Sequence, residues 1–232
     1  MAWWLKSDEY YGPYFNWVNE DSVEVRRGLV GSGMSLSRPL SAKNVPAAAR
    51  SKKRTKNTNF PDVFIAAYAV ACNQNFKNLV EEFEPAMHLF APIELQYHGG
   101  RRVEGDFYFF NCNIDVDCVL TDNNPNWFAD GGDRIISAFN SIQRLTPLEI
   151  SLSEPQIAGR HLWTGGPLGW NQLFVFNAFA DALKKNRIRG TQRWRECHEV
   201  DRPWVAEEHM GPLLDKWRAY VVADRNCEVG YI

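Results

Sequence analysis

The chain has 232 residues, of which 45% are hydrophobic, and its formal net charge at pH 7 is −2. This length allows one sizeable domain or two small ones, and the apolar fraction is ordinary for a globular protein. The near-neutral charge creates no field that would draw the whole molecule to nucleic acid or to a membrane, so we expect neither partner.

Signals for targeting and for disulfides are absent from the sequence. The first residues lack the basic start and the long apolar run of a secretory signal. No apolar segment approaches the roughly 20 residues that a membrane span needs. The number of cysteines is odd, so we expect reduced thiols in a cytoplasmic protein. The cysteines are Cys72, Cys112, Cys118, Cys197 and Cys227.

The N-terminal part of the chain predicts aromatic strands followed by a loop. Residues 1–30 are rich in Trp and Tyr and are interrupted by a turn signal at Gly12-Pro13. Their rings form either a binding surface or a sheet that covers the core, and we favour the second. Residues 31–59 are dominated by Gly, Ser, Pro, Lys and Arg, which predicts a long loop. We therefore expect residues 1–59 to form one compact domain with an α+β region, residues 60–232.

The best-defined predicted element is a helix that follows Asn73. An Asn side chain at this position can cap the helix by accepting a hydrogen bond from an unpaired N–H of the first turn. Pro85 ends the helix, because proline restricts the residue before it and cannot continue the hydrogen-bond ladder. An apolar stripe at helical spacing predicts the buried face: Phe76, Leu79, Val80 and Phe83.

Shorter elements are predicted on both sides of this helix. Asp62 is a possible cap for a short helix through Tyr68. Residues 87–94 alternate as a strand, in which Pro92 indicates a sheet edge or a bulge. Residues 106–119 and 148–153 also predict strands.

A second helix–strand unit follows the same plan. Asn177 is its predicted cap, Gly190 suits the position after the helix end, and residues 191–197 alternate as a strand. The apolar side consists of Ala180, Leu183 and Ile188. Laying Asn73 on Asn177 aligns the two units, which indicates either an internal duplication or the ordinary likeness of amphipathic helices. The predicted class is α+β, with a mixed or antiparallel sheet on which two helix–strand units pack.

A cluster of acidic residues within residues 115–133 leaves three interpretations open. It forms solvated loops, an acidic interface for a basic partner, or a calcium or two-carboxylate site. The third is disfavoured, because the spacing does not match an EF-hand loop. The carboxylates are Asp115, Asp117, Asp122, Asp130 and Asp133.

No motif for catalysis or for a metal is present. The histidines are scattered, the cysteines lack the paired spacing of a zinc site, and residues 164–169, a flexible Gly-rich stretch, do not form a phosphate loop. We therefore predict no catalytic residue, metal or cofactor, although an enzyme stays open because catalytic triads assemble in space. Trp163 is predicted in the core and Trp170 on the surface.

Several of these motifs, in their order along residues 60–197, resemble a bacterial immunity protein family of polymorphic toxin systems, the eleventh class of such proteins. One departure is Asn177-Ala178, where the family usually carries Ser-Asp; Asn caps as well as Ser does. The motifs are Phe60-Pro61-Asp62, Leu79 to Pro85 with Glu84, Phe90-Ala91-Pro92, Phe107 to Asp117, Ile157 to Trp163, and Phe174 to Leu183 with Gly190.

The resemblance implies a cytoplasmic protein that binds and neutralises a secreted toxin encoded beside it, without an activity or cofactor of its own. We expect a one-to-one complex with a toxin that is a nuclease. The alternatives are an enzyme that reverses a toxin-made modification and an adaptor that loads an effector into the secretion machinery. Toxin contacts are expected in exposed segments, at Asp115, Asp117, Asp122, Asp130, Asp133, Trp127, Trp170, Tyr11, Tyr14 and Trp17.

Overall fold

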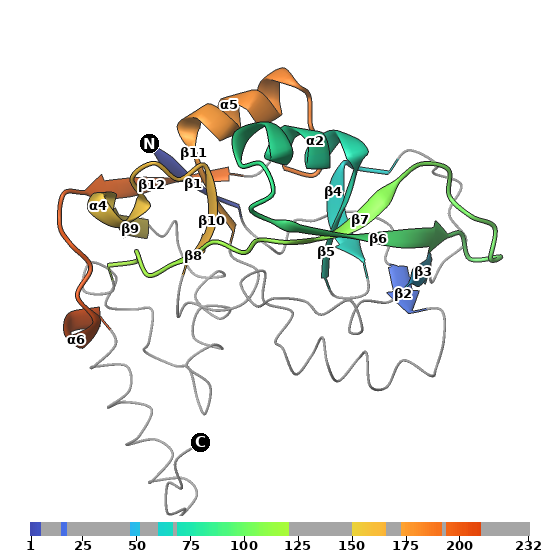
Figure 1. The fold of residues 1–232 in the computed structure, drawn as a ribbon, viewed down its shortest axis with the longest axis horizontal. Helices are drawn as coiled ribbons and strands as arrows, with labels where there is room; N and C mark the ends of the chain where they lie inside the picture. The colour runs from blue at the N-terminus through green and yellow to red at the C-terminus, as the bar shows by residue number, and fades with distance from the viewer. Residues whose placement is uncertain are drawn as a thin grey trace, which may run out of the picture.

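The fold consists of two β-sheets with a pair of helices lying across them (Figure 1). The computed structural model describes residues 1–5, 15–17, 47–51, 60–66, 69–120, 150–165, 173–191 and 194–209. The predicted α+β class is confirmed, and both sheets are mixed, because each contains parallel and antiparallel pairs. No helix in these ranges is long and apolar enough to cross a membrane.

The first sheet closes into a barrel in the order β2-β3-β6-β7-β5-β4. Aromatic and small aliphatic side chains such as Phe64, Phe109 and Ala71 form one buried cluster there. The strands are β2 (Phe15–Trp17), β3 (Ala48–Ser51), β4 (Val63–Ala66), β5 (Ala69–Asn73), β6 (Leu89–Gln96) and β7 (Phe107–Asn111).

The second sheet has the order β8-β10-β11-β1-β12-β9. The residues after β8 also reach the opposite edge, because Val119 bridges to Leu152 of β9 and the N–H of Leu120 donates to Ser151 O at 3.0 Å. The segment from β8 to Leu120 therefore forms one edge of the sheet beside β10 and also contacts β9, the strand at the other edge. The strands are β1 (Ala2–Leu5), β8 (Asp115–Val116), β9 (Ile150–Ser153), β10 (Leu162–Gly165), β11 (Leu173–Phe176) and β12 (Trp194–Val200).

The two sheets repeat the same pairings. In the first, β5 and β6 flank β7 antiparallel, β4 pairs antiparallel with β5, and β3 pairs parallel with β6. In the second, β11 and β12 flank β1, β10 pairs with β11, and β9 with β12, in the same directions. Strand β2 pairs parallel with β4 in the first sheet, and β8 pairs parallel with β10 in the second. This agreement favours an internal duplication over a chance likeness, with β1 taking the place that β7 has in the first half.

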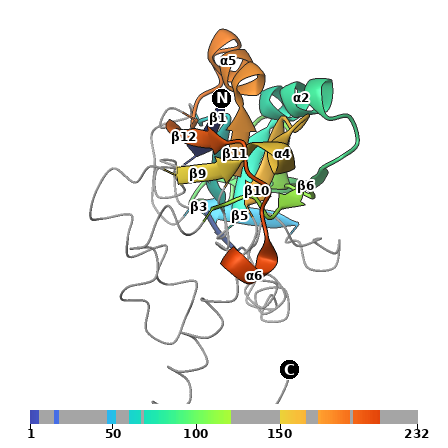
Figure 2. The same ribbon diagram turned by 90° about the vertical axis from the view of Figure 1, so that its left-hand side faces the viewer.

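Each half carries one helix between equivalent strands, α2 (Gln74–Phe83) after β5 and α5 (Asn177–Lys185) after β11. Both views show the two helices side by side on the same side of the strands (Figures 1 and 2). Phe76 and Phe179 meet edge to face, with ring centroids 6.5 Å apart. The short helices are α4 (Glu154–Ile157) and α6 (Ala206–His209).

The prediction for the first helix is confirmed. Asn73 is the N-cap, and its side-chain oxygen accepts from the N–H of Phe76 at 3.2 Å. The helix ends at Phe83, before Pro85, and the predicted stripe faces the core. In β6, the N–H of Glu94 points to Ala47, so the nitrogen of Pro92, two residues earlier, points the same way, beyond the end of β3. The strand can therefore hold a proline without losing a bond to β7.

The predicted cap of the second helix is wrong. The N-cap is Phe176, without a side-chain bond, and Asn177 is the first helical residue. Its side-chain oxygen instead accepts from the indole N–H of Trp3 at 3.1 Å. The alignment of the two units therefore shifts by one residue, so that Phe76 corresponds to Phe179. After the helix end, Arg187 rather than Gly190 takes the first left-handed conformation, with a φ of 53°.

Three predictions of local structure also need correction. Residues 63–66 form β4 instead of the short helix that Asp62 would cap, because they pair with β5 along their length. Residues 48–51, assigned to the long loop, form β3. Thr164 and Gly165, at the start of the stretch predicted as flexible, belong to β10. The predicted core position of Trp163 is confirmed, since the side chain is fully buried.

Candidate functional site

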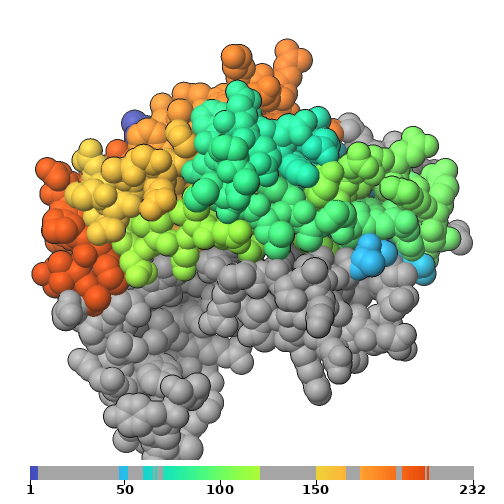
Figure 3. Space-filling view, in the orientation of Figure 1, coloured from blue at the N-terminus to red at the C-terminus, as the bar shows by residue number. Residues whose placement is uncertain are grey.

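The described part of the acidic cluster lies at the edge strand β8. Side chains alternate there: Ile114 and Val116 point into the core, whereas their neighbours Asn113, Asp115 and Asp117 are exposed. We call these three exposed residues the acidic row. In the space-filling view, yellow-green atoms of this part of the chain are exposed below α2 (Figure 3). The row therefore offers two carboxylates and an amide to a partner.

Strand β10 holds the acidic row from one side. The backbone N–H of Thr164 donates to Ile114 O at 2.8 Å. The hydroxyl of Thr164 lies 3.1 Å from Ile114 O and 3.0 Å from Asp115 Oδ1, and it donates to one of them at a time. This contact fixes both the backbone and the first carboxylate of the row.

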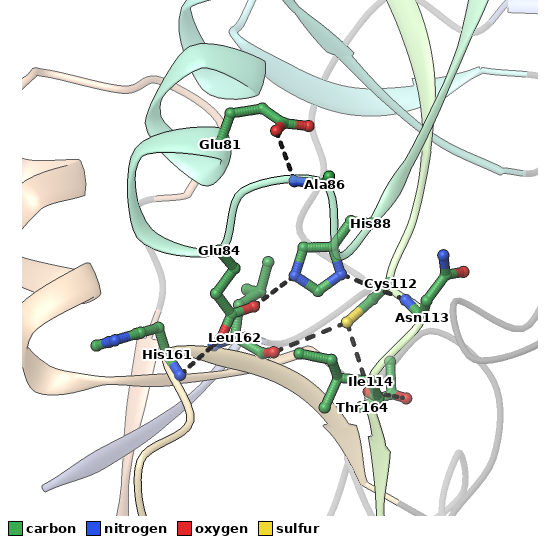
Figure 4. A network of polar contacts seen from close by, with 10 residues as sticks. All are labelled: Glu81, Glu84, Ala86, His88, Cys112, Asn113, Ile114, His161, Leu162 and Thr164. Atoms are coloured by element: carbon green, nitrogen blue, oxygen red, sulfur yellow. Dashed lines mark hydrogen bonds and ion pairs between the residues drawn. The ribbon is translucent and has the colours of Figure 1, made fainter.

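A buried pair, Glu84 and His88, holds the row from the other side (Figure 4). His88 Nε2 lies 2.5 Å from Glu84 Oε2, and His88 Nδ1 accepts from the backbone N–H of Asn113 at 3.3 Å. The other oxygen of Glu84 accepts from the N–H groups of His161 and Leu162 at 2.9 and 3.2 Å. These bonds join the end of α2, the start of β6, the start of β10 and the row.

The pKa values of the carboxylates at this site are shifted in opposite directions. Burial alone would raise the pKa of Glu84, but the bonds from His88 and from the backbone outweigh it and hold the pKa below its usual range. Packed neighbours partly dehydrate Asp115 even though its outer side is exposed, which raises its pKa, and the charge of Asp117 adds to the shift. Dehydration also raises the pKa of Asp117. Partial dehydration therefore disfavours the ionised form of both carboxylates, and a positive charge placed against them would favour it.

A carboxylate, a histidine and a thiol occur together here, as in Cys–His catalytic sets. Cys112, however, is fully buried and donates to Ile114 O at 3.5 Å. Burial raises the pKa of its thiol far above neutrality, so the thiolate needed for attack does not form. Both nitrogens of His88 are already engaged. The arrangement supports a structural role, in which Glu84 and His88 connect β10 to the row, and does not support a cysteine nucleophile.

Metal ligands do not gather in the described ranges, where no group of three or more His, Cys, Asp or Glu side chains could hold an ion. The four cysteines described, Cys72, Cys112, Cys118 and Cys197, are free and buried, as reduced thiols would be. Burial raises the pKa of Cys118 to about 12.

Most of the other candidates for partner contact stay predictions. Trp17 lies in β2, of which only the backbone is described, and β2 occupies in the first half the place of β8 in the second. The remaining candidates lie outside the described residues: Tyr11, Tyr14, Asp122, Trp127, Asp130, Asp133 and Trp170.

Sequence reasoning missed the residues that hold the row. The sequence presents Glu84 only as part of the motif from Leu79 to Pro85, without a partner, and gives no role to His88 or Thr164. A buried histidine in an alternating strand pattern gives no signal of its own. The four-residue separation from Glu84 gives no signal either, because that spacing brings side chains together only within a helix, and the helix ends at Phe83.

A family model, the immunity protein family Imm11, matches residues 9–199, which is most of the chain and includes the whole site described above. No curated protein matches the chain.

Proposed function

The chain belongs to the immunity protein family Imm11, and on this premise we propose that it neutralises a cognate toxin by binding it in a one-to-one complex in the cytoplasm. The family supports a toxin-neutralising role and an inhibitor rather than an enzyme. We propose further that the toxin is a nuclease delivered by a neighbouring cell, and that the complex protects the producer and its kin.

The observation that carries this proposal is the acidic row, which is exposed and yet held in place from both sides. A nuclease binds nucleic acid through Lys and Arg, so its substrate-binding surface is basic. Two ordered carboxylates complement such a surface, accelerate encounter by electrostatic steering and lose little conformational entropy on binding. The rest of the acidic cluster, Asp122, Asp130 and Asp133, would extend the same interface.

Substitution of the row tests the interface. The double variant Asp115→Asn, Asp117→Asn removes two charges but keeps side-chain size and an oxygen that can accept from Thr164. We expect toxin affinity at low salt to fall about tenfold and its salt dependence to weaken. The control is Asp181→Asn, which removes a charge from an exposed residue of α5. Unchanged affinity and salt slope in the double variant would remove the row from the interface.

The stoichiometry of protection separates inhibition from catalysis. Toxin activity is titrated with purified protein, and inhibition should be complete at one equivalent. Protection by a small fraction of an equivalent, with release of a modified product, would instead show the enzyme alternative. An adaptor for secretion would bind its effector without inhibiting it.

A further inference from the structure

We propose that Glu84 is a positioning residue for the acidic row, because it sets the tautomer of His88 and thereby makes the ring accept the N–H of Asn113. This inference rests on the proposed function, since it assigns a task to residues behind the proposed interface. Glu84 is buried and is not expected to touch a partner.

The hydrogen bonds define the tautomer. A backbone N–H can only donate, so His88 Nδ1, which accepts from Asn113, must carry a lone pair. In a neutral ring the proton then sits on Nε2, which lies against Glu84 Oε2. An ionised carboxylate accepts only, and it therefore favours this tautomer over the other one.

The carboxylate is itself fixed from the second half of the molecule. Its other oxygen accepts from the N–H groups of His161 and Leu162, at the start of β10. The side chain of Glu84 therefore cannot rotate without losing these bonds. The ring of Phe83, the residue before it, also packs on the ring of His161, with centroids 5.2 Å apart. The start of β10 therefore positions the carboxylate of Glu84, which positions the imidazole of His88, which in turn binds the N–H of Asn113.

The consequence for the row follows from its two supports. Thr164 holds Ile114 and Asp115, and His88 holds Asn113. Without the second support, the beginning of the row would have to be ordered when a partner binds, and that ordering would reduce affinity.

A single isosteric change, Glu84→Gln, tests whether the carboxylate sets the tautomer of His88. The amide of Gln has one accepting and one donating end. If its oxygen serves His161 and Leu162, its NH2 group faces His88 Nε2, and the ring must move its proton to Nδ1, against the N–H of Asn113. If the amide turns over, its NH2 group faces the two backbone N–H groups instead. The first orientation loses one hydrogen bond, that of the Asn113 N–H to His88, whereas the second leaves the N–H groups of His161 and Leu162 without an acceptor, so we expect the first.

The matched control is Glu81→Gln, on the same helix and with the same loss of charge (Figure 4). Glu81 Oε2 accepts from the N–H of Ala86 at 2.9 Å at an exposed position. The oxygen of Gln can accept the same bond, so this variant should behave as the unmodified protein does.

Three measurements are made on the 232-residue chain: long-range ¹⁵N–¹H NMR of its imidazoles, amide hydrogen exchange at Asn113, and affinity for the toxin. We expect the Nε2–H tautomer at His88 in the unmodified protein. In Glu84→Gln we expect faster exchange at Asn113 and an affinity about tenfold weaker, with neither change in Glu81→Gln.

A proton on Nδ1 of His88 in the unmodified protein would overturn the inference, and this measurement needs no variant if Glu84→Gln fails to fold. Unchanged exchange and affinity in a folded Glu84→Gln protein would overturn it as well. The proposed interface fails separately, if Asp115→Asn, Asp117→Asn binds toxin normally while the tautomer and the exchange behave as expected.

Discussion

Tyr108 and Trp3 occupy equivalent positions in the two halves of the fold. Each lies in the strand that runs between the two strands flanking a helix, and each donates to the side-chain amide at the first residue of that helix. The Tyr108 hydroxyl lies 2.5 Å from Gln74 Oε1, and the Trp3 indole nitrogen lies 3.1 Å from Asn177 Oδ1. A lysine from the same helix covers each ring: Lys77 in the first half and Lys184 in the second.

This relationship predicts matched costs for two substitutions. Tyr108→Phe and Trp3→Phe each remove a donor from a half-buried amide oxygen, so each should lower the free energy of unfolding by about 1 kcal/mol. Because the two bonds lie in different halves, the double variant should show the sum. Urea denaturation measures all three. A cost for only one variant would contradict the equivalence of the two positions.

Asp62 predicts a larger effect, because it ties three segments together. Its Oδ1 accepts from Asn73 Nδ2 at 2.6 Å, and its Oδ2 accepts from the N–H of Arg189 at 2.7 Å. Asp62→Ala should lower the free energy of unfolding by about 3 kcal/mol, since two partly buried donors lose the buried carboxyl group that accepts from them. Asp181→Ala is the control, because its ion pair with Lys184 is exposed and should contribute about 0.5 kcal/mol or less. An equal loss of stability in the two variants would show that the hydrogen bonds of Asp62 do not hold these segments together.

A side chain at Gly190, next to the Arg189 that binds Asp62, would clash with the backbone of Val63. The φ of Gly190 is 94°, and a Cβ there would lie 2.0 Å from the carbonyl oxygen of Val63. Gly190→Ala should therefore cost about 3 kcal/mol or more. Gly159→Ala provides the comparison, since φ is 73° but no atom lies within 4 Å, which leaves a conformational cost of about 1 kcal/mol. A small loss of stability in Gly190→Ala would mean that the backbone at Val63 can move away from the added methyl group.

The two helices show what local sequence could and could not predict. Asn73 and Asn177 both precede an apolar stripe, and the capping rule applies to both. Only Asn73 caps, because Asn177 is one residue further into its helix, where its amide serves Trp3. That partner comes from β1, at the opposite end of the chain, and no pattern within the helix indicates it.

For the acidic row, too, the local sequence indicates one part of the site and the fold alone shows the other. Two of the three interpretations of the acidic cluster, solvated loops and an acidic interface, require exposed carboxylates, and Asp115 and Asp117 are exposed. Their supports come from the end of α2 and from β10, which are distant in sequence. Hydrophobic periodicity contains no information about such polar contacts, so this part of the site emerges only from the fold.

Thiol chemistry provides a test of the core. The four described cysteines are buried, and burial raises the pKa of each thiol. In the native protein at pH 8, iodoacetamide should therefore leave all four unmodified over hours, and site-resolved mass spectrometry should find them labelled only after urea is added. Rapid native labelling of Cys112 would contradict its burial and reopen the question of a cysteine nucleophile.

Acid sensitivity of toxin binding tests the row without changing the fold. The pKa of Asp115 and Asp117 is raised, by partial dehydration and, for Asp115, by the charge of its neighbour. A basic partner binds the ionised carboxylates, so affinity should be fully present above their raised pKa and lost as the pH falls through it. The loss should therefore begin above the ordinary value of 3.8 for Asp.

Glu84 also affects stability at acid pH, so unfolding is followed beside binding. Its pKa is lowered, so its contribution to stability is present above the ordinary value of 4.5 and is lost only as the pH falls below that value. Affinity is measured by calorimetry against pH, with Asp115→Asn, Asp117→Asn as the reference that cancels titration of the toxin. If the ratio of the two affinities does not change with pH, the row does not bind as ionised carboxylates.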